Sequence, residues 1–472
     1  MEPSEHSTDI LETAERLRSG RTTASELTSQ FLARIAERDG AYGAYVHVSA
    51  DHALGRAAVA DSELARGLDR GPLHGIPLAV KDLCDTAFAP TSVGTRIFAG
   101  RRPAANATVV SRLLDAGAVI LGKLTMTEGA FSTHHPDVPT PRNPLGSDLW
   151  VGPSSTGSGV AVAAGLCLGA IGSDTGGSIR FPSATCGLTG LKPTWGRVSR
   201  HGVFPLADSL DHIGPMGRSV GDCAAILQVI AGPDPADPTS LQAGVPNYLE
   251  GMNAPIAGLR IGIDRDYALT GVCAEVASAL ETALDAFAQL GATIVEVRAP
   301  DSADLAANWV TLCAVETAVV HAATYPSRAS EYGRDLAAMI ELGRRTRAGD
   351  VAAWHNRRLE YTTALNAALA SVDALLIPTL PFTIPTVDEM RDGQAPASAH
   401  QDLLRFTAPF DFSGHPTLCL PNGQDGRALP LSMQLVGSKL GEDMLVRLGH
   451  AYQQVTSWHL RPAAALTEPL TT

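Results

Sequence analysis

The sequence predicts an α/β protein in which helices flank a sheet. Short apolar strands alternate with amphipathic helices along most of the 472 residues. Residues 71–82 show the pattern clearly, because turn-forming Gly and Pro precede a short apolar strand there. Hydrophobic residues make up 45% of the chain, which is enough for a sizeable core. A β–α–β rhythm of this kind is typical of a sheet covered by helices.

The first half of the chain begins with helices and continues with alternating strands and helices. Residues 8–38 predict two helices, and the second begins at a capping box formed by Thr23 and Glu26. Seven further segments follow: a strand at 45–48, an Ala-rich helix to about 67, a strand at 78–80, a helix at 108–116, a strand at 119–121, a helix at 159–166 and a strand at 168–172.

The second half repeats the same alternation. Its predicted elements are a helix at 220–230, a strand at 260–263, a helix at 272–289, a strand at 293–297, mostly helical stretches at 303–323 and 332–370, strands at 374–377, 417–420 and 432–436, and a last helix at 442–454. No internal repeat or clear linker interrupts the chain, so we expect one domain over residues 1–472, with an N-terminal helical segment (1–70), a core (71–235) and a helical subregion (300–370).

The net charge and the cysteine content indicate which kinds of binding partner and which cellular compartment to expect. The net charge of −13 argues against binding to nucleic acid, which requires a basic face. The seven Cys are scattered without a CxxC motif, which predicts buried free thiols and a reducing compartment. The N-terminus shows no apolar signal segment, and the uncharged run at 149–173 has too short an apolar part to span a membrane. We therefore expect a cytoplasmic protein with no membrane partner.

Residues 152–180 contain two Ser/Gly clusters, 152–159 and 172–178, separated by a short apolar run. A Gly-rich backbone held against a core can present N–H groups and a Ser oxygen to a reacting carbonyl. The dinucleotide, P-loop, GxSxG, SxxK and HExxH motifs are all absent. The adjacent His134 and His135 lack metal-ligand spacing, so we assign them to a loop and predict neither a metal nor a cofactor.

Lysine is scarce, which makes each lysine informative. Only four of the 36 basic residues are Lys. Lys81 follows an apolar strand, and a buried, neutral Lys can serve as the base for a Ser nucleophile. Lys123 is a rival by the same logic, whereas Lys192, which precedes Pro193, is expected in a turn or at the surface.

These motifs together resemble the amidase signature family. The resemblance is carried by GIPLAVKD (75–82), GKLTMTEGAF (122–131), GPSSTGSGVAVAAG (152–165), GSDTGGSIRFPSATCG (172–187) and the C-terminal QLVG (434–437). It covers most of the chain. It implies an amidase-signature fold, with a large mixed central β-sheet covered on both sides by α-helices, and a Ser–cisSer–Lys triad.

The resemblance assigns roles by position. It implies Ser178 as the nucleophile, Ser154 as the bridging residue with an unusual cis peptide, and Lys81 as the base. Further roles fall on the oxyanion-hole N–H groups of Thr175, Gly176 and Gly177, on the supporting residues Asp174, Arg180 and Ser155, and on the pocket residues Met126, Thr127 and Phe131. A Gly-Gly pair before the nucleophile lets N–H groups converge without Cβ clashes.

The sequence departs from the family pattern at two positions beside the predicted bridging serine. Pro153 and Thr156 stand where Gly is common in the family, and they flank the Ser154–Ser155 pair on both sides. Residues 300–370 are expected to shape the pocket. The aromatic side chains Trp309, Trp354 and Phe406 could line the pocket or belong to the core, and the core is favoured.

The implied function is hydrolysis of the C–N bond of a small amide, aryl amide or carbamate (urethane) through an acyl-enzyme. Two alternatives stay open: a glutaminase-like component of a tRNA-dependent amidotransferase (its A subunit), and a catalytically silent binding protein of the same fold. The intact Lys81, Ser154 and Ser178 argue against the silent protein. The sequence also leaves a homodimer open.

Overall fold

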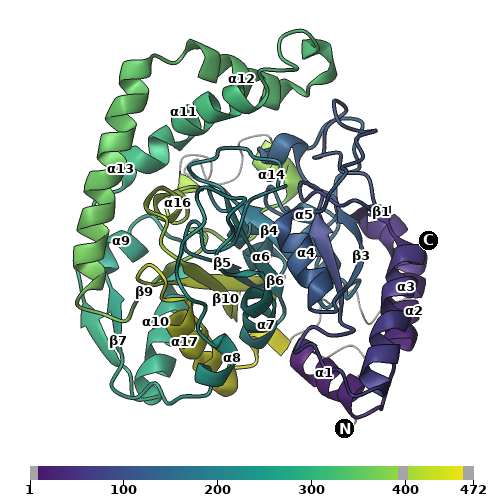
Figure 1. Cartoon of the computed structure of the whole chain (residues 1–472). Helices are drawn as coiled ribbons and strands as arrows, with labels where there is room; N and C mark the ends of the chain where they lie inside the picture. The colour runs from purple at the N-terminus through teal and green to yellow at the C-terminus, as the bar shows by residue number, and fades with distance from the viewer. Residues whose placement is uncertain (1–8, 392–401, 461–472) are drawn as a thin grey trace.

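A single 11-stranded sheet runs through the molecule (Figure 1). The structure is a computed structural model that describes residues 9–391 and 402–460. The strands are β1 (Tyr45–Val48), β2 (Pro77–Lys81), β3 (Val119–Leu124), β4 (Gly169–Asp174), β5 (Thr189–Lys192), β6 (His212–Gly217), β7 (Arg260–Ile263), β8 (Thr293–Glu296), β9 (Ala374–Pro378), β10 (Thr417–Gln424) and β11 (Pro430–Val436).

The sheet is mixed, as the resemblance implied. Its strand order is β1-β3-β2-β4-β6-β5-β10-β11-β9-β7-β8. The neighbours β3, β2 and β4 run parallel, and so do β9, β7 and β8. The pairs from β4 through β6, β5, β10 and β11 to β9 are antiparallel, as is the edge pair of β1 with β3. Strands β2 and β4 are buried along their whole length, because parallel neighbours carry helices on their faces.

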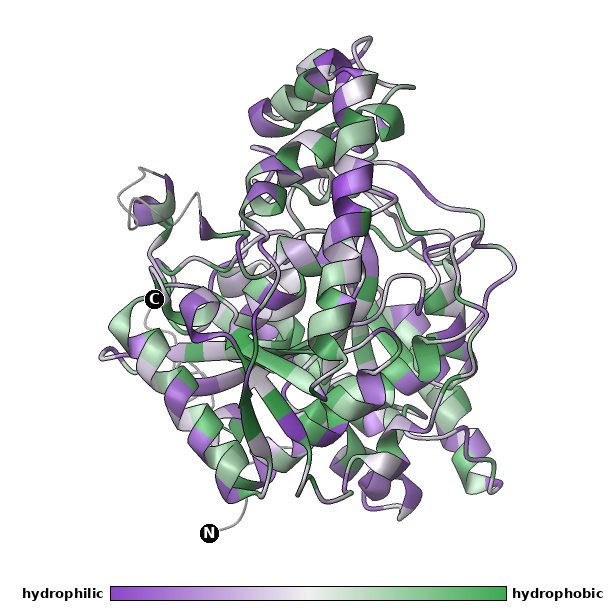
Figure 2. Ribbon diagram, turned by 90° about the vertical axis from the view of Figure 1, so that its left-hand side faces the viewer, coloured by the Kyte–Doolittle hydropathy of each residue, from purple (hydrophilic) through white to green (hydrophobic). Residues whose placement is uncertain are grey.

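Helices surround the sheet. They are α1 (Ile10–Arg18), α2 (Ala24–Tyr42), α3 (Ala50–Ala65), α4 (Thr108–Asp115), α5 (Thr156–Ala163), α6 (Arg180–Thr185), α7 (Val220–Ile230), α8 (Tyr248–Gly251), α9 (Arg265–Leu269), α10 (Ala274–Gln289), α11 (Ala303–Val320), α12 (Arg334–Arg345), α13 (Ala348–Leu369), α14 (Val387–Arg391), α16 (Ala408–Ser413) and α17 (Glu442–Val455). Apolar segments gather at the centre in Figure 2, and polar segments lie on the outer helices.

Both faces of the sheet are covered by other parts of the chain. The side chains that lie over Gly169 and over Gly172 identify the covering elements. Above Gly169 of β4 lie the side chains of Ile10 from α1 and Ile226 from α7. Above Gly172, which points to the opposite face, lie Ser155 and Ile179 beside α5 and α6. The two Ser/Gly clusters of the sequence therefore meet on one face of the sheet, at the end of β4.

Helices α11, α12 and α13 rise beyond the sheet in both views (Figures 1 and 2). Helix α11 is long and apolar enough to cross a membrane by length and composition alone, and 39% of it is buried inside the structure. Its Leu305, Trp309 and Leu312 belong to the main core, as expected for a core helix of a globular fold.

The predicted capping box of α2 is present, with Thr23 and Glu26 bonding each other's backbone. All seven Cys are free, and six of them are buried, as predicted. The strands β5 and β6 were not predicted, because the Gly and Pro in TGLK and HIGPMG hide any alternation. Lys192 ends β5 with its side chain fully buried, so its predicted turn or surface position is wrong.

Candidate active site

Lys81 is the last residue of β2, and its amine contacts three serine hydroxyls. Lys81 Nζ lies 2.7 Å from Ser154 Oγ, 2.9 Å from Ser155 Oγ and 2.8 Å from Ser173 Oγ. All four side chains are buried. The structure thus brings together the predicted Lys81, Ser154 and Ser155, and adds Ser173 of β4, which the sequence pattern did not single out.

Burial changes the protonation of this amine. Removal from water lowers the pKa of Lys81 to about 7, because the neutral form suffers less from the loss of solvent. A neutral amine has two N–H groups and one lone pair, so one of its three neighbours must donate to it. The Ser155 hydroxyl donates to the carbonyl oxygen of Ser173 at 3.1 Å. The lone pair of Lys81 is therefore available to the hydroxyl of Ser154 or of Ser173.

The peptide bond between Pro153 and Ser154 is cis, as the resemblance implied for the bridging serine. Thr156, the other departure from the family pattern, lies 3.0 Å through its Oγ1 from His134 Nε2. With Pro153 and Thr156 at these positions, Ser154 Oγ lies 2.7 Å from Lys81 Nζ. His134 lies in a loop, as predicted, and burial lowers its pKa to about 4.

The loop from Asp174 to Ser178 joins β4 to α6. Ser178 is the only partly exposed residue between residues 166 and 186, all of the others being buried. Its carbonyl oxygen accepts from the N–H of Ser155 at 3.3 Å, which ties the two Ser/Gly clusters together. The candidate nucleophile is thus the point of this buried region that a substrate can reach.

Two glycines in this loop allow a close approach of the backbone to aromatic rings. A Cβ atom at Gly176 would lie 2.7 Å from the Trp309 ring, and one at Gly177, where φ is +135°, would lie 2.4 Å from the Phe181 ring. Among the described residues, the N–H groups of Thr175 and Gly176 have no acceptor, whereas the N–H of Gly177 donates to Asp174 Oδ1 at 2.6 Å. In this state, two of the three predicted oxyanion-hole N–H groups are free.

Asp174 and Arg180, expected as supporting residues, form a buried ion pair. Arg180 Nη2 lies 2.8 Å from Asp174 Oδ1 and 2.6 Å from Asp411 Oδ2 of α16. Asp174 also accepts from the backbone N–H groups of Gly177 and Ile179. Although burial opposes it, Arg180 holds the pKa of Asp174 well below its usual range. The pair fixes both ends of the loop that carries Ser178.

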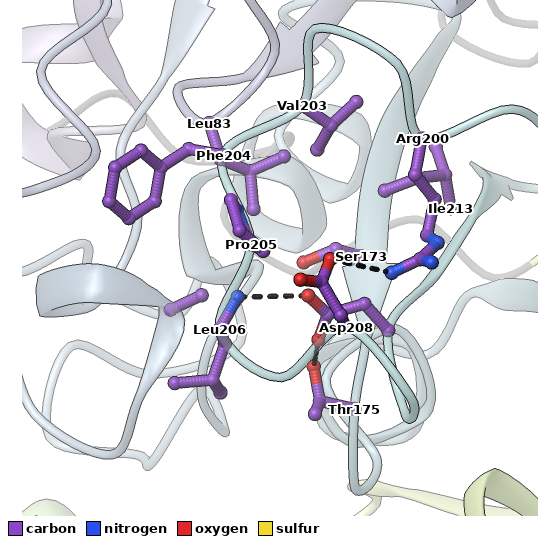
Figure 3. A pocket seen from close by; sticks show the side chains of 12 residues that line it. Leu83, Ser173, Thr175, Arg200, Val203, Phe204, Pro205, Leu206, Asp208 and Ile213 are labelled. Carbon is purple, nitrogen blue, oxygen red and sulfur yellow. Dashed lines mark hydrogen bonds and ion pairs between the residues drawn. The ribbon is translucent and has the colours of Figure 1, made fainter. Parts of the chain in front are cut away.

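A pocket lies beside Ser173 and Thr175 (Figure 3). Its lining comes mostly from residues 200–213, a segment to which the sequence pattern assigned no role. Asp211 accepts from the Thr175 hydroxyl at 2.6 Å and from the N–H groups of Leu206 and Ala207. Burial raises the pKa of Asp211 to about 6. The remaining lining consists of the charged residues Arg200 and Asp208 and of seven apolar residues: Leu83, Ala130, Val203, Phe204, Pro205, Leu206 and Ile213.

The segment 126–131 contributes to this region differently from the expectation. Ala130 lines the pocket, whereas Met126 belongs to the main core and Phe131 packs partly buried against it. The N–H of Thr127 donates to the carbonyl oxygen of Ser154 at 3.3 Å. Thr127 is thus placed to support the backbone of the bridging serine.

Lys123, the rival base, lies among other partners. Its Nζ is 3.0 Å from Asp82 Oδ1 and 2.6 Å from Thr91 Oγ1, and it contacts none of the serines around Lys81. The geometry therefore favours Lys81. No group of three or more His, Cys, Asp or Glu side chains in residues 9–391 and 402–460 is arranged to hold a metal ion.

Three aromatic residues were expected in the core. Trp309 is buried, but its Nε1–H also donates to the carbonyl oxygen of Thr175 at 2.8 Å. Phe406 is fully buried, and Trp354 is partly buried against the core. Composition could not reveal the contact of Trp309, because it joins residues 134 positions apart.

Comparisons with known proteins identify the family. The model of the family described as "Amidase" matches residues 26–446. The chain belongs to the amidase family. It is 46% identical to the Mycobacterium tuberculosis protein named "Putative amidase AmiD", over 96% of this chain and 95% of that protein. It is 39% identical to the glutamyl-tRNA(Gln) amidotransferase A subunit of Chloroflexus aurantiacus, over 94% of this chain and 95% of that one.

Solved structures of amidase-family enzymes have the same fold. The peptide amidase of Stenotrophomonas maltophilia superposes with a TM-score of 0.81 at 31% identity, covering 96% of this chain and 97% of that one. The 6-aminohexanoate cyclic dimer hydrolase in complex with substrate gives a TM-score of 0.87 at 26% identity, covering 98% of this chain and all of the other. The family resemblance and the fold inferred from the motifs are thus confirmed, and this chain is an amidase signature hydrolase.

Proposed function

We propose that this amidase cleaves the C–N bond of a small amide through an acyl-enzyme on Ser178, with Lys81 as the base and Ser154 as the proton relay. The observation that carries the proposal is the 2.7 Å contact between Lys81 Nζ and Ser154 Oγ in a site that excludes water. A lysine whose pKa is about 7 supplies the neutral amine that this role needs at physiological pH.

The reaction proceeds in two stages. Neutral Lys81 takes the proton of Ser154, Ser154 takes that of Ser178, and Ser178 Oγ bonds to the carbonyl carbon. The oxygen of the tetrahedral intermediate is stabilised by the N–H groups of Thr175 and Gly176, which have no acceptor among the described residues. The C–N bond then breaks, and the amine leaves with a proton returned along the same path. Water hydrolyses the ester of Ser178 and restores the serine.

Within this class, the proposed substrates are carboxylic amides, aryl amides and carbamates, which present the same carbonyl to the same groups. Two relatives support a broad amide range, since one is a peptide amidase and the other hydrolyses the cyclic dimer of 6-aminohexanoate.

The decisive experiment is a panel of anilides, primary amides, esters and carbamates tested with the purified chain. We expect turnover of at least one amide by the wild type and a fall of at least about 1000-fold in Ser178→Ala. A fluorophosphonate should label the wild type on the tryptic peptide that contains Ser178, as read by tandem mass spectrometry. Unchanged turnover in Ser178→Ala, or labelling of another residue, contradicts the mechanism.

A role as the glutaminase component of an amidotransferase is a second candidate, favoured by the 39% identity to the A subunit from Chloroflexus aurantiacus. A component of that kind releases ammonia from glutamine for a partner. Glutamine added to the purified chain should yield no ammonia above the Ser178→Ala background if simple amides are the substrates. Ammonia release from glutamine that exceeds anilide turnover reverses this assignment.

A further inference from the structure

The peptide unit between Thr175 and Gly176 is hydrogen-bonded at its C=O but, among the described residues, not at its N–H. Trp309 Nε1–H donates to the carbonyl oxygen of Thr175 at 2.8 Å. The N–H of the same peptide unit belongs to Gly176 and has no acceptor among the described residues. A peptide unit is planar and trans, so fixing its C=O fixes the direction of its N–H.

Trp309 also limits movement of this unit by contact. Its side chain comes from α11 and is 7% exposed. The indole lies against Gly176 so closely that a Cβ atom there would stand 2.7 Å from the ring. Helix α11, which is remote in sequence, thus reaches the backbone beside Ser178.

The next peptide unit, between Gly176 and Gly177, is held on both sides. Thr407 Oγ1 donates to the carbonyl oxygen of Gly176 at 2.6 Å, and the N–H of Gly177 donates to Asp174 Oδ1 at 2.6 Å. Loss of one of these two bonds leaves the other in place. Loss of the Trp309 N–H would leave the carbonyl oxygen of Thr175 without the only group that donates a hydrogen bond to it among the described residues.

We propose that Trp309 is a positioning residue that orients the Thr175–Gly176 peptide so that the Gly176 N–H faces the developing oxyanion. The proposal rests on the proposed function, because it gives this N–H the task of stabilising the tetrahedral intermediate. A donor that is already oriented stabilises the transition state without reorganisation at the moment of reaction. A unit free to rotate would spend part of its time with the N–H turned away.

The test is Trp309→Phe, which keeps an aromatic ring over Gly176 and removes the N–H. We expect kcat to fall between about fivefold, the value of one neutral hydrogen bond, and about 100-fold, the lower cost of deleting an oxyanion donor. KM should change less than about threefold. Affinity for a trifluoromethyl ketone that forms a tetrahedral adduct with Ser178 should fall in parallel with kcat, whereas affinity for a non-covalent competitive amide should not.

Two further variants separate positioning from packing. Trp354→Phe makes the same change on α13, where the ring packs partly buried against the core, and its kcat should match the wild type. Thr407→Val should lower kcat less than Trp309→Phe does, because Asp174 still holds the Gly176–Gly177 unit. If Trp309→Phe proves insoluble, Thr407→Val still tests the proposal. A fall in kcat of more than about 100-fold in Thr407→Val would contradict it, because the Gly176–Gly177 unit should tolerate the loss of one of its two hydrogen bonds.

Unchanged kcat and adduct affinity in Trp309→Phe overturn the proposal, as does an equal fall in adduct and competitive-amide affinity. Failure of the proposed function looks different, because wild-type activity would then survive Ser178→Ala. If Ser178→Ala is inactive and Trp309→Phe equals the wild type, the acyl-enzyme stands and only the role of Trp309 is wrong.

Discussion

Lys81 owes its proposed chemistry to its surroundings. Burial lowers its pKa to about 7, and three hydroxyls within 3 Å replace the water that a surface lysine would bind. Lys123 is equally buried, yet it is paired with Asp82 and shares none of these contacts. Two lysines that follow similar apolar strands thus differ because of what lies around each side chain in space.

The pKa of Lys81 predicts the pH dependence of acylation. The amine must be neutral to accept a proton, and its neutral fraction rises with pH through a pKa of about 7. The rate of fluorophosphonate labelling of Ser178 should therefore rise about tenfold per pH unit below about pH 7 and level off above it. Stopped reactions read by mass spectrometry from about pH 5 to about pH 9 measure this. A labelling rate independent of pH across that range excludes Lys81 as the base.

At the scale of elements, a buried carboxylate ties the segment 126–131 to the raised helices. Both oxygens of Glu128 lie 3.0 Å from the N–H of Gly333, the residue before α12. An acceptor is favoured there, because the first N–H groups of a helix lack partners within it, although burial raises the pKa of the Glu128 carboxyl. One charged side chain thus joins the neighbourhood of the bridging Ser154 to the start of α12.

Glu128→Ala should destabilise the fold by about 1–3 kcal/mol, because it leaves the buried N–H of Gly333 without its acceptor. Chemical denaturation followed by circular dichroism measures the change. The matched control is Glu331→Ala, which removes a half-exposed pair with Arg328 and should have a much smaller effect on stability. Equal losses in the two variants would show that the contact with Gly333 contributes nothing particular.

At the scale of the whole molecule, Arg180 connects the middle of the chain to its C-terminal part. It contacts Asp174 at the end of β4, Asp411 of α16 and the carbonyl oxygen of Thr407. All of these atoms are buried, so each contact replaces a bond to water that folding removes. The planar guanidinium can satisfy several acceptors at once, which a lysine cannot do.

Arg180→Lys should therefore cost about 2–4 kcal/mol of stability, since the shorter point charge cannot reach both carboxylates and the carbonyl. Urea denaturation gives the difference directly. Arg298→Lys is the control, because Arg298 pairs with Asp266 where both side chains are more than 80% exposed, and its effect should be within about 0.5 kcal/mol. A loss for Arg180→Lys no larger than that of the control would contradict a role in joining the two parts.

Local patterns determined much of this protein. The α/β class, most helices and every strand except β5 and β6 follow from periodicity and turn residues, which act over a few positions. The rare lysines indicated Lys81 and its rival Lys123, and the resemblance to the amidase signature family assigned roles to Lys81, Ser154 and Ser178, because its motifs are contiguous in the sequence. The strands β5 and β6 were not predicted from the sequence. They carry Gly and Pro at positions where a strand pattern would show alternation, and they are stabilised by pairing with neighbouring strands in the sheet.

Tertiary structure alone decided which groups meet. It brought Ser173 to Lys81, Trp309 to Thr175, and Asp411 to Arg180, the last pair across 231 positions of the chain. It also placed Lys81 beside these serines and Lys123 beside Asp82, and it buried Lys192. Burial, hydrogen-bond geometry and pKa depend on atoms that are close in space, and a linear sequence states only which residues are close along the chain. The chemistry proposed for the serines therefore follows from the sequence, whereas the orientation of the groups around them follows from the fold.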